Sequence, residues 1–99
     1  MAVYQVAIVK IENRTSGLME YVKKSGEIVA KYGAEYLVRG PADSILEGSY
    51  LQGRSVIVSK WPSMEKVKEF WNSQDYQAAK VLREGSGVYD IGLFNEAPK

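Results

Sequence analysis

The sequence predicts an α+β fold whose elements follow the order βαββαβ. Four short segments are rich in β-branched and aromatic residues, which is typical of strands. Other segments repeat apolar residues at helical spacing, and glycine, proline or serine separates the segments from one another. The chain has 99 residues, of which 45% are hydrophobic and 25% charged, as in ordinary globular proteins. We therefore expect a single domain over residues 1–99.

The first two elements are a strand and a long amphipathic helix. Residues 3–11 contain no glycine or proline, and they are mostly apolar on both faces. Residues 13–17 carry turn and N-cap chemistry. Apolar residues then recur at helical spacing from Leu18 to Tyr32, opposite a charged side. Gly33 follows the last turn, where a glycine commonly ends a helix.

The middle of the chain predicts two further strands. Residues 34–40 read as the second strand, which Gly40-Pro41 interrupts. The pattern allows residues 45–47 to continue this strand after a bulge or loop. Residues 48–53 are turn material, and residues 54–61 form the third strand around Val56-Ile57-Val58.

The C-terminal third predicts two short helices and a last strand. Ser63 is expected to cap the first helix and Ser73 the second, with a break at Asn72-Ser73 between them. Gly85 closes the second helix, and residues 88–94 form the strand. The buried side of the two helices is expected to comprise Met64, Val67, Phe70, Trp71, Tyr76, Ala79 and Leu82.

This order is that of the ferredoxin-like split βαβ fold, a four-stranded antiparallel sheet with helices on one face. Three of the four strands are apolar on both faces, whereas a sheet with one wet face alternates between apolar and polar residues. Covering several hundred Å² at about 25 cal/mol per Å² is worth many kcal/mol. We therefore expect a homodimer packed sheet to sheet. The alternative is a monomer whose bare sheet face binds a ligand or partner.

Composition excludes several classes of function. The chain has no cysteine and no histidine, so thiol nucleophiles, Ser-His-Asp triads, zinc sites of Cys and His, and an axial haem histidine are ruled out. Any proton transfer must use Asp, Glu, Lys or Tyr. The net charge of +1, without a basic block, argues against a nucleic-acid partner. We expect no cofactor, no metal and no membrane association, and the absence of a targeting pattern favours the cytoplasm.

Several segments, in order, resemble the small bacterial family catalogued as domain of unknown function 1330. They are residues 31–40, Leu46-Glu47-Gly48, Arg54, residues 61–65, residues 70–76 and Leu82-Arg83. That family is similar to dimeric α+β barrel proteins, whose two sheets face each other around an interior cavity. The resemblance therefore implies a dimeric α+β barrel, and it implies no settled activity.

The sequence departs from the common form of this family at three places. Gly33-Ala34 stands where the family commonly has Gly-Gly, and one glycine suffices for the cap. Trp61 and Trp71 stand where it often has phenylalanine and tyrosine. The larger rings are expected to narrow a cavity or to move a ligand within it.

Three arginines near the ends of elements suggest an anionic organic ligand. A planar guanidinium at Arg39, Arg54 or Arg83 can hold a carboxylate or phosphate through two hydrogen bonds. In the alternative interpretation, these arginines form surface ion pairs or bridge two subunits, at no more than about 1 kcal/mol each. The remaining candidate ligand-binding residues are Tyr36, Trp71 and Asn72.

Glu47 and Tyr76 are the candidate catalytic residues. Glu47 would act as a general base if burial raised the pKa of its carboxyl, and otherwise it is a surface carboxylate before a turn. Tyr76 would donate a hydrogen bond or a proton to a ligand, or else pack beneath the last helix with its hydroxyl satisfied.

Two hypotheses of function follow from these residues. In the first, the protein binds a small anionic organic molecule in a cavity of the dimer, either simply as a binding protein or as a cofactor-independent enzyme. In the second, it is a non-enzymatic ligand-binding or interaction module whose dimer interface is mainly structural.

Overall fold

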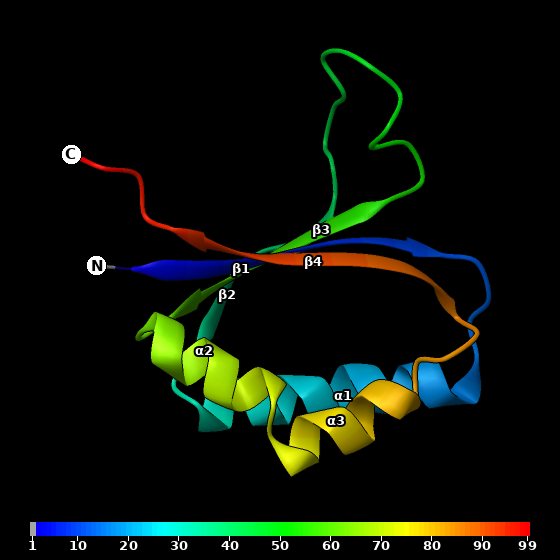
Figure 1. The fold of residues 1–99 in the computed structure, drawn as a ribbon. Coiled ribbons are helices and arrows are strands. Elements are labelled where there is room, and N and C mark those ends of the chain that lie inside the picture. The colour runs from blue at the N-terminus through cyan, green and yellow to red at the C-terminus, as the bar shows by residue number, and fades with distance from the viewer. Residues whose placement is uncertain (1) are drawn as a thin grey trace.

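The computed structural model describes residues 2–99 and consists of one sheet with a layer of helices on one side (Figure 1). In chain order, the elements are β1 (Val3–Ile11), α1 (Ser16–Lys31), β2 (Glu35–Pro41), β3 (Ser55–Trp61), α2 (Met64–Trp71), α3 (Gln74–Val81) and β4 (Gly87–Asn95). The strands lie in the order β2-β3-β1-β4, and every neighbouring pair is antiparallel. The predicted ferredoxin-like βαββαβ fold, with its helices on one face, is confirmed.

Each helix begins at a hydroxyl side chain. Thr15, Ser63 and Ser73 each accept a hydrogen bond from the backbone N–H three residues later, at 3.0–3.1 Å. Such caps satisfy N–H groups that have no partner inside the helix. Gly33, at φ +79°, lies just beyond α1 in a backbone conformation that residues with a Cβ rarely adopt. The predicted caps at Ser63 and Ser73 and the predicted helix end at Gly33 are confirmed.

Residues 42–54 form a loop that projects from the sheet on the side opposite to the helices (Figure 1), and we call it the arm. The predicted continuation of the second strand at residues 45–47 is wrong. Pro41 pairs with Ser55 at the start of β3, so no strand remains beside residues 45–47 to receive their hydrogen bonds. Every residue from 41 to 50 is exposed, and Leu46 is 97% exposed.

An irregularity in β2 decides which way its side chains point. The pairing of β2 with β3 shifts between Tyr36 and Val38, so Leu37 is one extra residue in the strand. In a regular strand, residues three apart point to opposite faces. Because of the bulge, Tyr36 and Arg39 instead pair with β3 residues two positions apart, and both point to the helix side.

The core fills one half of the space between sheet and helices. Trp61, Val67 and Phe70 are 1%, 0% and 1% exposed. The ring centroids of Trp61 and Phe70 lie 4.6 Å apart, and those of Phe70 and Tyr76 lie 4.5 Å apart. Met64 and Trp71 pack against this cluster. The helical stripe that the sequence predicted therefore forms the core beneath α2.

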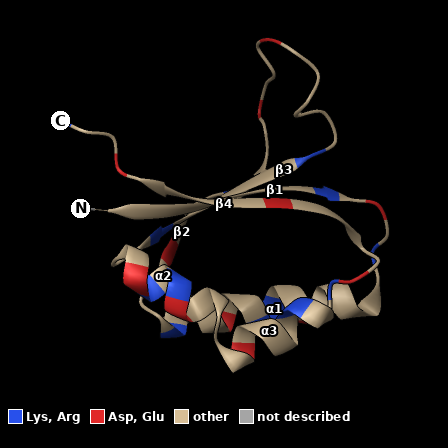
Figure 2. Cartoon of the chain, in the orientation of Figure 1, with Lys and Arg blue, Asp and Glu red and all other residues tan. Residues whose placement is uncertain are grey.

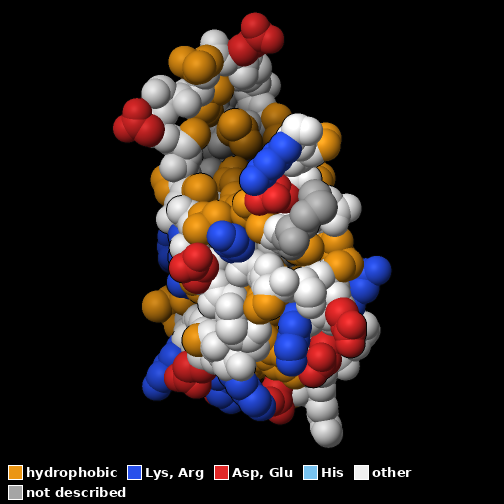
Figure 3. Space-filling view, turned by 90° about the vertical axis from the view of Figure 1, so that its left-hand side faces the viewer, with side chains coloured by type: hydrophobic (Ala, Val, Ile, Leu, Met, Phe, Trp, Pro, Cys, Tyr) orange, Lys and Arg blue, Asp and Glu red, His pale blue; other side chains and the backbone are white. Residues whose placement is uncertain are grey.

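The other face of the sheet remains bare in the single chain. Large hydrophobic residues on the strands are half exposed, including Val38, Val88 and Phe94. Figure 2 shows that charged residues are concentrated on the helix layer, and Figure 3 shows hydrophobic side chains gathered over the upper part of the molecule, along the sheet and arm. No helix within residues 2–99 is long and apolar enough to cross a membrane.

Candidate functional site

A pocket of about 310 Å³ lies between the helix side of the sheet, α1 and the segment that follows α3. This volume is at the lower end of the range of about 300–1,000 Å³ that is usual for small-molecule sites. The pocket occupies the half of the interlayer space that the Trp61 cluster leaves open. There the sheet carries Ala7, Ser55 and Ile57, which line the pocket.

Arg83 is the most deeply buried charged residue of the pocket, at 9% exposed. Its guanidinium carbon lies 4.0 Å from the centroid of the Tyr89 ring and 5.3 Å from that of Tyr21. Within residues 2–99, no carboxylate lies within ion-pair distance of Arg83, and its guanidinium donates no hydrogen bond to another residue. No fully buried side-chain nitrogen or oxygen within residues 2–99 lacks a hydrogen-bond partner, so the guanidinium nitrogens keep some contact with solvent. The largely buried cation is therefore open to a charged group from outside the chain.

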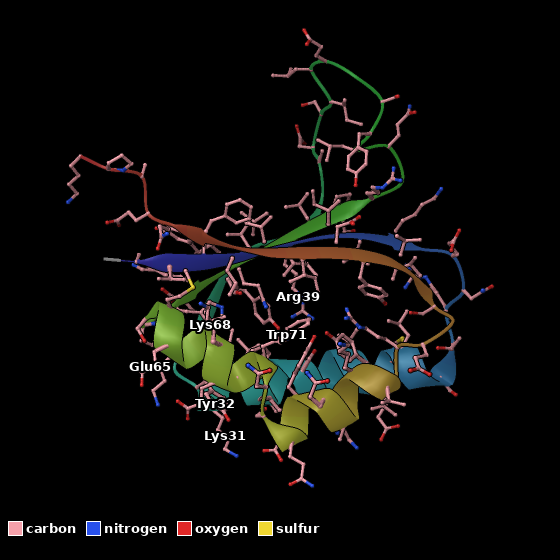
Figure 4. All side chains as sticks on the ribbon, viewed as in Figure 1. Lys31, Tyr32, Arg39, Glu65, Lys68 and Trp71 are labelled. Carbon is pink, nitrogen blue, oxygen red and sulfur yellow. The ribbon has the colours of Figure 1, made fainter. Side chains whose placement is uncertain are left out.

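Arg39 enters the pocket from the opposite edge of the sheet. Its guanidinium carbon lies 4.6 Å from the centroid of the Tyr36 ring. Figure 4 shows Arg39 between the sheet and the helix layer, and this side chain is exposed, unlike that of Arg83. Burial raises the pKa of Tyr36 above its ordinary value, and the adjacent charge of Arg39 opposes that rise. Arg39 thus provides a positive charge at the edge of the pocket.

Two tyrosine hydroxyls meet at the helix side of the pocket. The Oη atoms of Tyr21 and Tyr76 lie 3.0 Å apart. Burial, reinforced by the neighbouring Tyr21 hydroxyl, raises the pKa of Tyr76 far above its ordinary value. Tyr76 therefore stays protonated at neutral pH, where it can donate a hydrogen bond and cannot serve as a base.

The lining of the pocket has an unbalanced charge. The whole chain has 13 basic and 12 acidic residues, yet the lining holds three arginines (Arg14, Arg39 and Arg83) and no Asp or Glu. The lining also holds no Lys, so none of its side chains is suited to accept a proton near neutral pH. No cluster of acidic residues within residues 2–99 could hold a metal ion. The pocket can bind and stabilise negative charge.

The structure brings four of the predicted site residues together. Tyr36, Arg39, Tyr76 and Arg83 all line the pocket, although they come from β2, from α3 and from the turn after α3. This pocket lies within one chain, on the helix side of the sheet. It is therefore distinct from the cavity between two facing sheets that the family resemblance implies.

The other four predicted residues lie outside the lining. Glu47 is exposed in the arm, and Arg54 at the end of the arm donates a hydrogen bond of 2.6 Å to the Tyr50 carbonyl. Trp71 packs on Tyr76 with ring centroids 5.1 Å apart, so it supports a pocket residue from behind. Asn72 donates to the Lys68 carbonyl at the end of α2. Their proposed roles in binding or catalysis remain predictions.

The sequence patterns do not identify six polar residues of the lining, which are Gln5, Arg14, Tyr21, Ser25, Ser55 and Tyr89. Tyr21 and Ser25 belong to the apolar stripe of α1. The helical pattern therefore predicts that their side chains are buried in the core, and it does not indicate a pocket. Arg14 lies in a polar turn that gives no signal of its own. Tyr89 faces the same side of the sheet as Val9, and the alternation of β4 contains that information.

The family model described as a domain of unknown function, DUF1330, matches residues 2–97. None of the proteins with curated descriptions matches the chain. Among solved structures, a protein of unknown function from Rhodopseudomonas palustris has a TM-score of 0.80 and 15% identity, with 99% of this chain and 84% of that chain covered.

Two further structures share the fold. A dimeric ferredoxin-like protein of unknown function from Jannaschia has a TM-score of 0.72 and 9% identity, covering 97% of this chain and 100% of that one. SnoaB, a cofactor-independent oxygenase from Streptomyces nogalater, has a TM-score of 0.62 and 10% identity, covering 99% of this chain and 95% of that one. At such identities the likeness shows the fold alone.

Proposed function

The chain belongs to the DUF1330 family, whose description names no activity, and we propose that it binds a small organic anion in the pocket between its sheet and its helices. One observation carries this proposal. Arg83 is 9% exposed, lines the pocket, and has no carboxylate partner within residues 2–99. A carboxylate from a ligand would supply the missing charge through two parallel hydrogen bonds.

The other lining residues indicate the chemistry of the uncharged part of the ligand. Leu18, Val29 and Ile57 give the pocket apolar walls, and Tyr21 and Tyr89 offer ring faces. An apolar or aromatic body would leave water for these surfaces, while hydroxyl groups nearby can donate to its oxygens. The ligand class is therefore a carboxylate with a hydrophobic body.

Calorimetry with benzoate and with its neutral amide, benzamide, tests this proposal. Benzoate should bind, benzamide should bind at least about tenfold more weakly, and Arg83→Gln should remove that difference, since a hydrogen-bonded charge is worth about 1.5–3 kcal/mol. Lys80→Gln is the matched control, because Lys80 also stacks on a ring, that of Trp71 at 4.8 Å, but lies outside the lining. Equal binding of both compounds, or binding that survives Arg83→Gln, would overturn the proposal.

The protein's partner in this proposal is a second copy of itself. The bare sheet face exposes Val38, Val88 and Phe94, and the exposed arm stands on the same side. The Jannaschia protein, which has this fold, is described as dimeric. Packing the two bare faces together would cover apolar surface while leaving both pockets on the outer, helix sides of the dimer.

The tyrosine pair favours a second candidate function, that of a cofactor-independent enzyme. One of these two hydroxyls, 3.0 Å apart, donates to the other, and the second would donate to the oxygen of an enolate near Arg83. In such a step the proton leaves the α-carbon for water, since the lining offers no base. Deuterium exchange at C3 of phenylpyruvate, the CH2 carbon next to the keto group, followed by NMR, tests it. Exchange should be faster with the protein than without it and should fall with Tyr76→Phe, whereas a pure binding protein would give no acceleration.

A further inference from the structure

The two charged ends of the pocket are held apart by the sheet. Arg39 is stacked on Tyr36 of β2, and Arg83 is stacked on Tyr89 of β4. These strands are the opposite edges of the sheet, separated by β3 and β1. Three inter-strand spacings of about 4.8 Å place the edge backbones about 14 Å apart. Cation–π contact holds each guanidinium against its own ring, so each has its own position at one side of the pocket.

One row of sheet side chains in the pocket is apolar. Arg39 pairs with Ile57 on β3, and the same row continues through Ala7 on β1 to Ile91 on β4. All three of these residues line the pocket. The lining therefore runs from one cation over an apolar row, flanked by the uncharged Gln5 and Ser55, to the other cation, with no acidic residue to neutralise either one.

The Arg83 end carries more positive charge than Arg83 alone. The backbone N–H groups of Glu12 and Asn13 both donate to the Ser86 carbonyl, at 2.7 and 2.9 Å. These two hydrogen bonds hold the turn that contains Arg14 beside the segment that contains Arg83. Arg14 also lines the pocket. A ligand with one acidic group at this end would leave the exposed guanidinium of Arg39, at the far edge of the pocket, to water and the Tyr36 ring alone.

We infer that the ligand is a dianion, with an apolar middle and one acidic group at each end. Arg83 holds one acidic group, with Arg14 beside it, and Arg39 holds the other. This inference rests on the proposed function, because it specifies the anion that the same pocket binds. The length of the ligand is set by the separation of the two stacked arginines.

Calorimetry with straight-chain dicarboxylates from butanedioate to decanedioate, each beside the monocarboxylate of the same length, tests this inference. At the best-fitting length, the dicarboxylate should bind at least about tenfold more tightly than its monocarboxylate. Arg39→Gln should reduce dicarboxylate affinity by a similar factor and leave monocarboxylate affinity unchanged. Arg83→Gln should weaken both, and Lys80→Gln should weaken neither. Unfolding by urea would show that each variant is folded.

Two results would overturn the inference in distinguishable ways. If every dicarboxylate binds no more tightly than its monocarboxylate, and both arginine variants weaken monocarboxylate binding alike, the two arginines share one acidic group. In that case the proposed binding of a small anion stands, and the inference that the ligand carries two acidic groups is wrong. If neither series binds, the inference of a dianion is wrong, and the proposed function fails with it only if benzoate also does not bind.

Discussion

The hydroxyl groups of Tyr21 and Tyr76 lie 3.0 Å apart, although 55 positions separate the two residues in the chain. Their rings meet edge to face, with centroids 6.4 Å apart at 63°. The pair joins α1 to α3 at the pocket and keeps both phenols hydrogen-bonded where water has limited access. A bond of this kind contributes about 0.5–1.5 kcal/mol, so it links the stability of the helix layer to the shape of the pocket.

Tyr76→Phe should make the protein less sensitive to alkaline pH. In the unfolded chain the tyrosine titrates near its ordinary pKa of 10.0, while burial holds the pKa far higher in the folded state. Below pH 10 both states are protonated and the stability is unaffected. Above pH 10 only the unfolded state loses its proton, so stability falls by up to about 1.4 kcal/mol per pH unit for this group. Urea unfolding at pH 9, 10 and 11 should show a shallower fall in the free energy of unfolding for Tyr76→Phe.

Tyr50→Phe in the exposed arm is the matched control, and its free energy of unfolding should fall with pH as that of the unsubstituted protein does. An unchanged slope in Tyr76→Phe would contradict the raised pKa of Tyr76.

Two glycines of α1 should respond oppositely to alanine. A Cβ at Gly17 would lie 2.3 Å from the Leu82 carbonyl oxygen, so Gly17→Ala should destabilise the fold by about 1–3 kcal/mol through forced separation of α1 from the end of α3. A Cβ at Gly26 would meet nothing within 4 Å, so Gly26→Ala should stabilise by about 0.5–1 kcal/mol. Thermal unfolding of both variants measures the contrast. Stabilisation by both substitutions would show that the two helices do not approach so closely.

Arg83→Met should abolish anion binding without lowering stability in the absence of ligand. Methionine keeps an unbranched apolar side chain beside Tyr89 and removes a buried charge that has no carboxylate partner within residues 2–99. Residues kept for binding often cost stability in this way. Urea unfolding and benzoate calorimetry on the same sample give both values. A loss of more than about 2 kcal/mol in stability would identify Arg83 as a structural cation instead.

Phe70→Ala should destabilise the protein by about 3–5 kcal/mol. Phe70 is 1% exposed and contacts Trp61 and Tyr76 at ring distances of 4.6 and 4.5 Å, so the substitution leaves a cavity at the centre of the core. Val81→Ala on the exposed side of α3, where Val81 is 58% exposed, should change stability by less than about 0.5 kcal/mol. Comparable losses in the two variants would mean that the core lies elsewhere.

Val58→Asp should convert the expected homodimer into a monomer. Val58 is central in β3 and pairs with Val6 on the face away from the helices, so the new carboxylate would be desolvated between two sheets. Sedimentation at micromolar concentration measures the outcome, with Val81→Asp on the helix layer as the control that should remain dimeric. A parent protein that sediments as a monomer would contradict the sheet-to-sheet arrangement.

The sequence predicts the elements well because local chemistry determines their ends. Thr15, Ser63 and Ser73 cap helices, Gly33 ends one, and the apolar stripe of α2 becomes core. The predicted strand at residues 45–47 does not form because a strand needs a neighbouring strand to pair with. The composition of a segment does not reveal whether such a neighbour lies beside it. The arm therefore contains the apolar pair Ile45-Leu46 and yet is irregular.

The site was predicted only in part, and for a related reason. Arg39 and Arg83 were found because a guanidinium near the end of an element is unusual enough to notice. Tyr21 was missed because its spacing on α1 equals that of core residues, and no local signal separates a side chain that fills a core from one that lines a pocket. Bringing Tyr36 and Arg39 to one face required a register shift that depends on the neighbouring strand.

That register shift has a consequence for how such pockets change during evolution. Removing Leu37 would leave Arg39 opposite Ile57 in an uninterrupted ladder, whereas moving the irregularity past Arg39 would turn the guanidinium outward. The hold that Arg39 is inferred to have on a second acidic group would thus be lost with every lining residue retained. Two relatives that share this arginine at the same aligned position need not share a ligand.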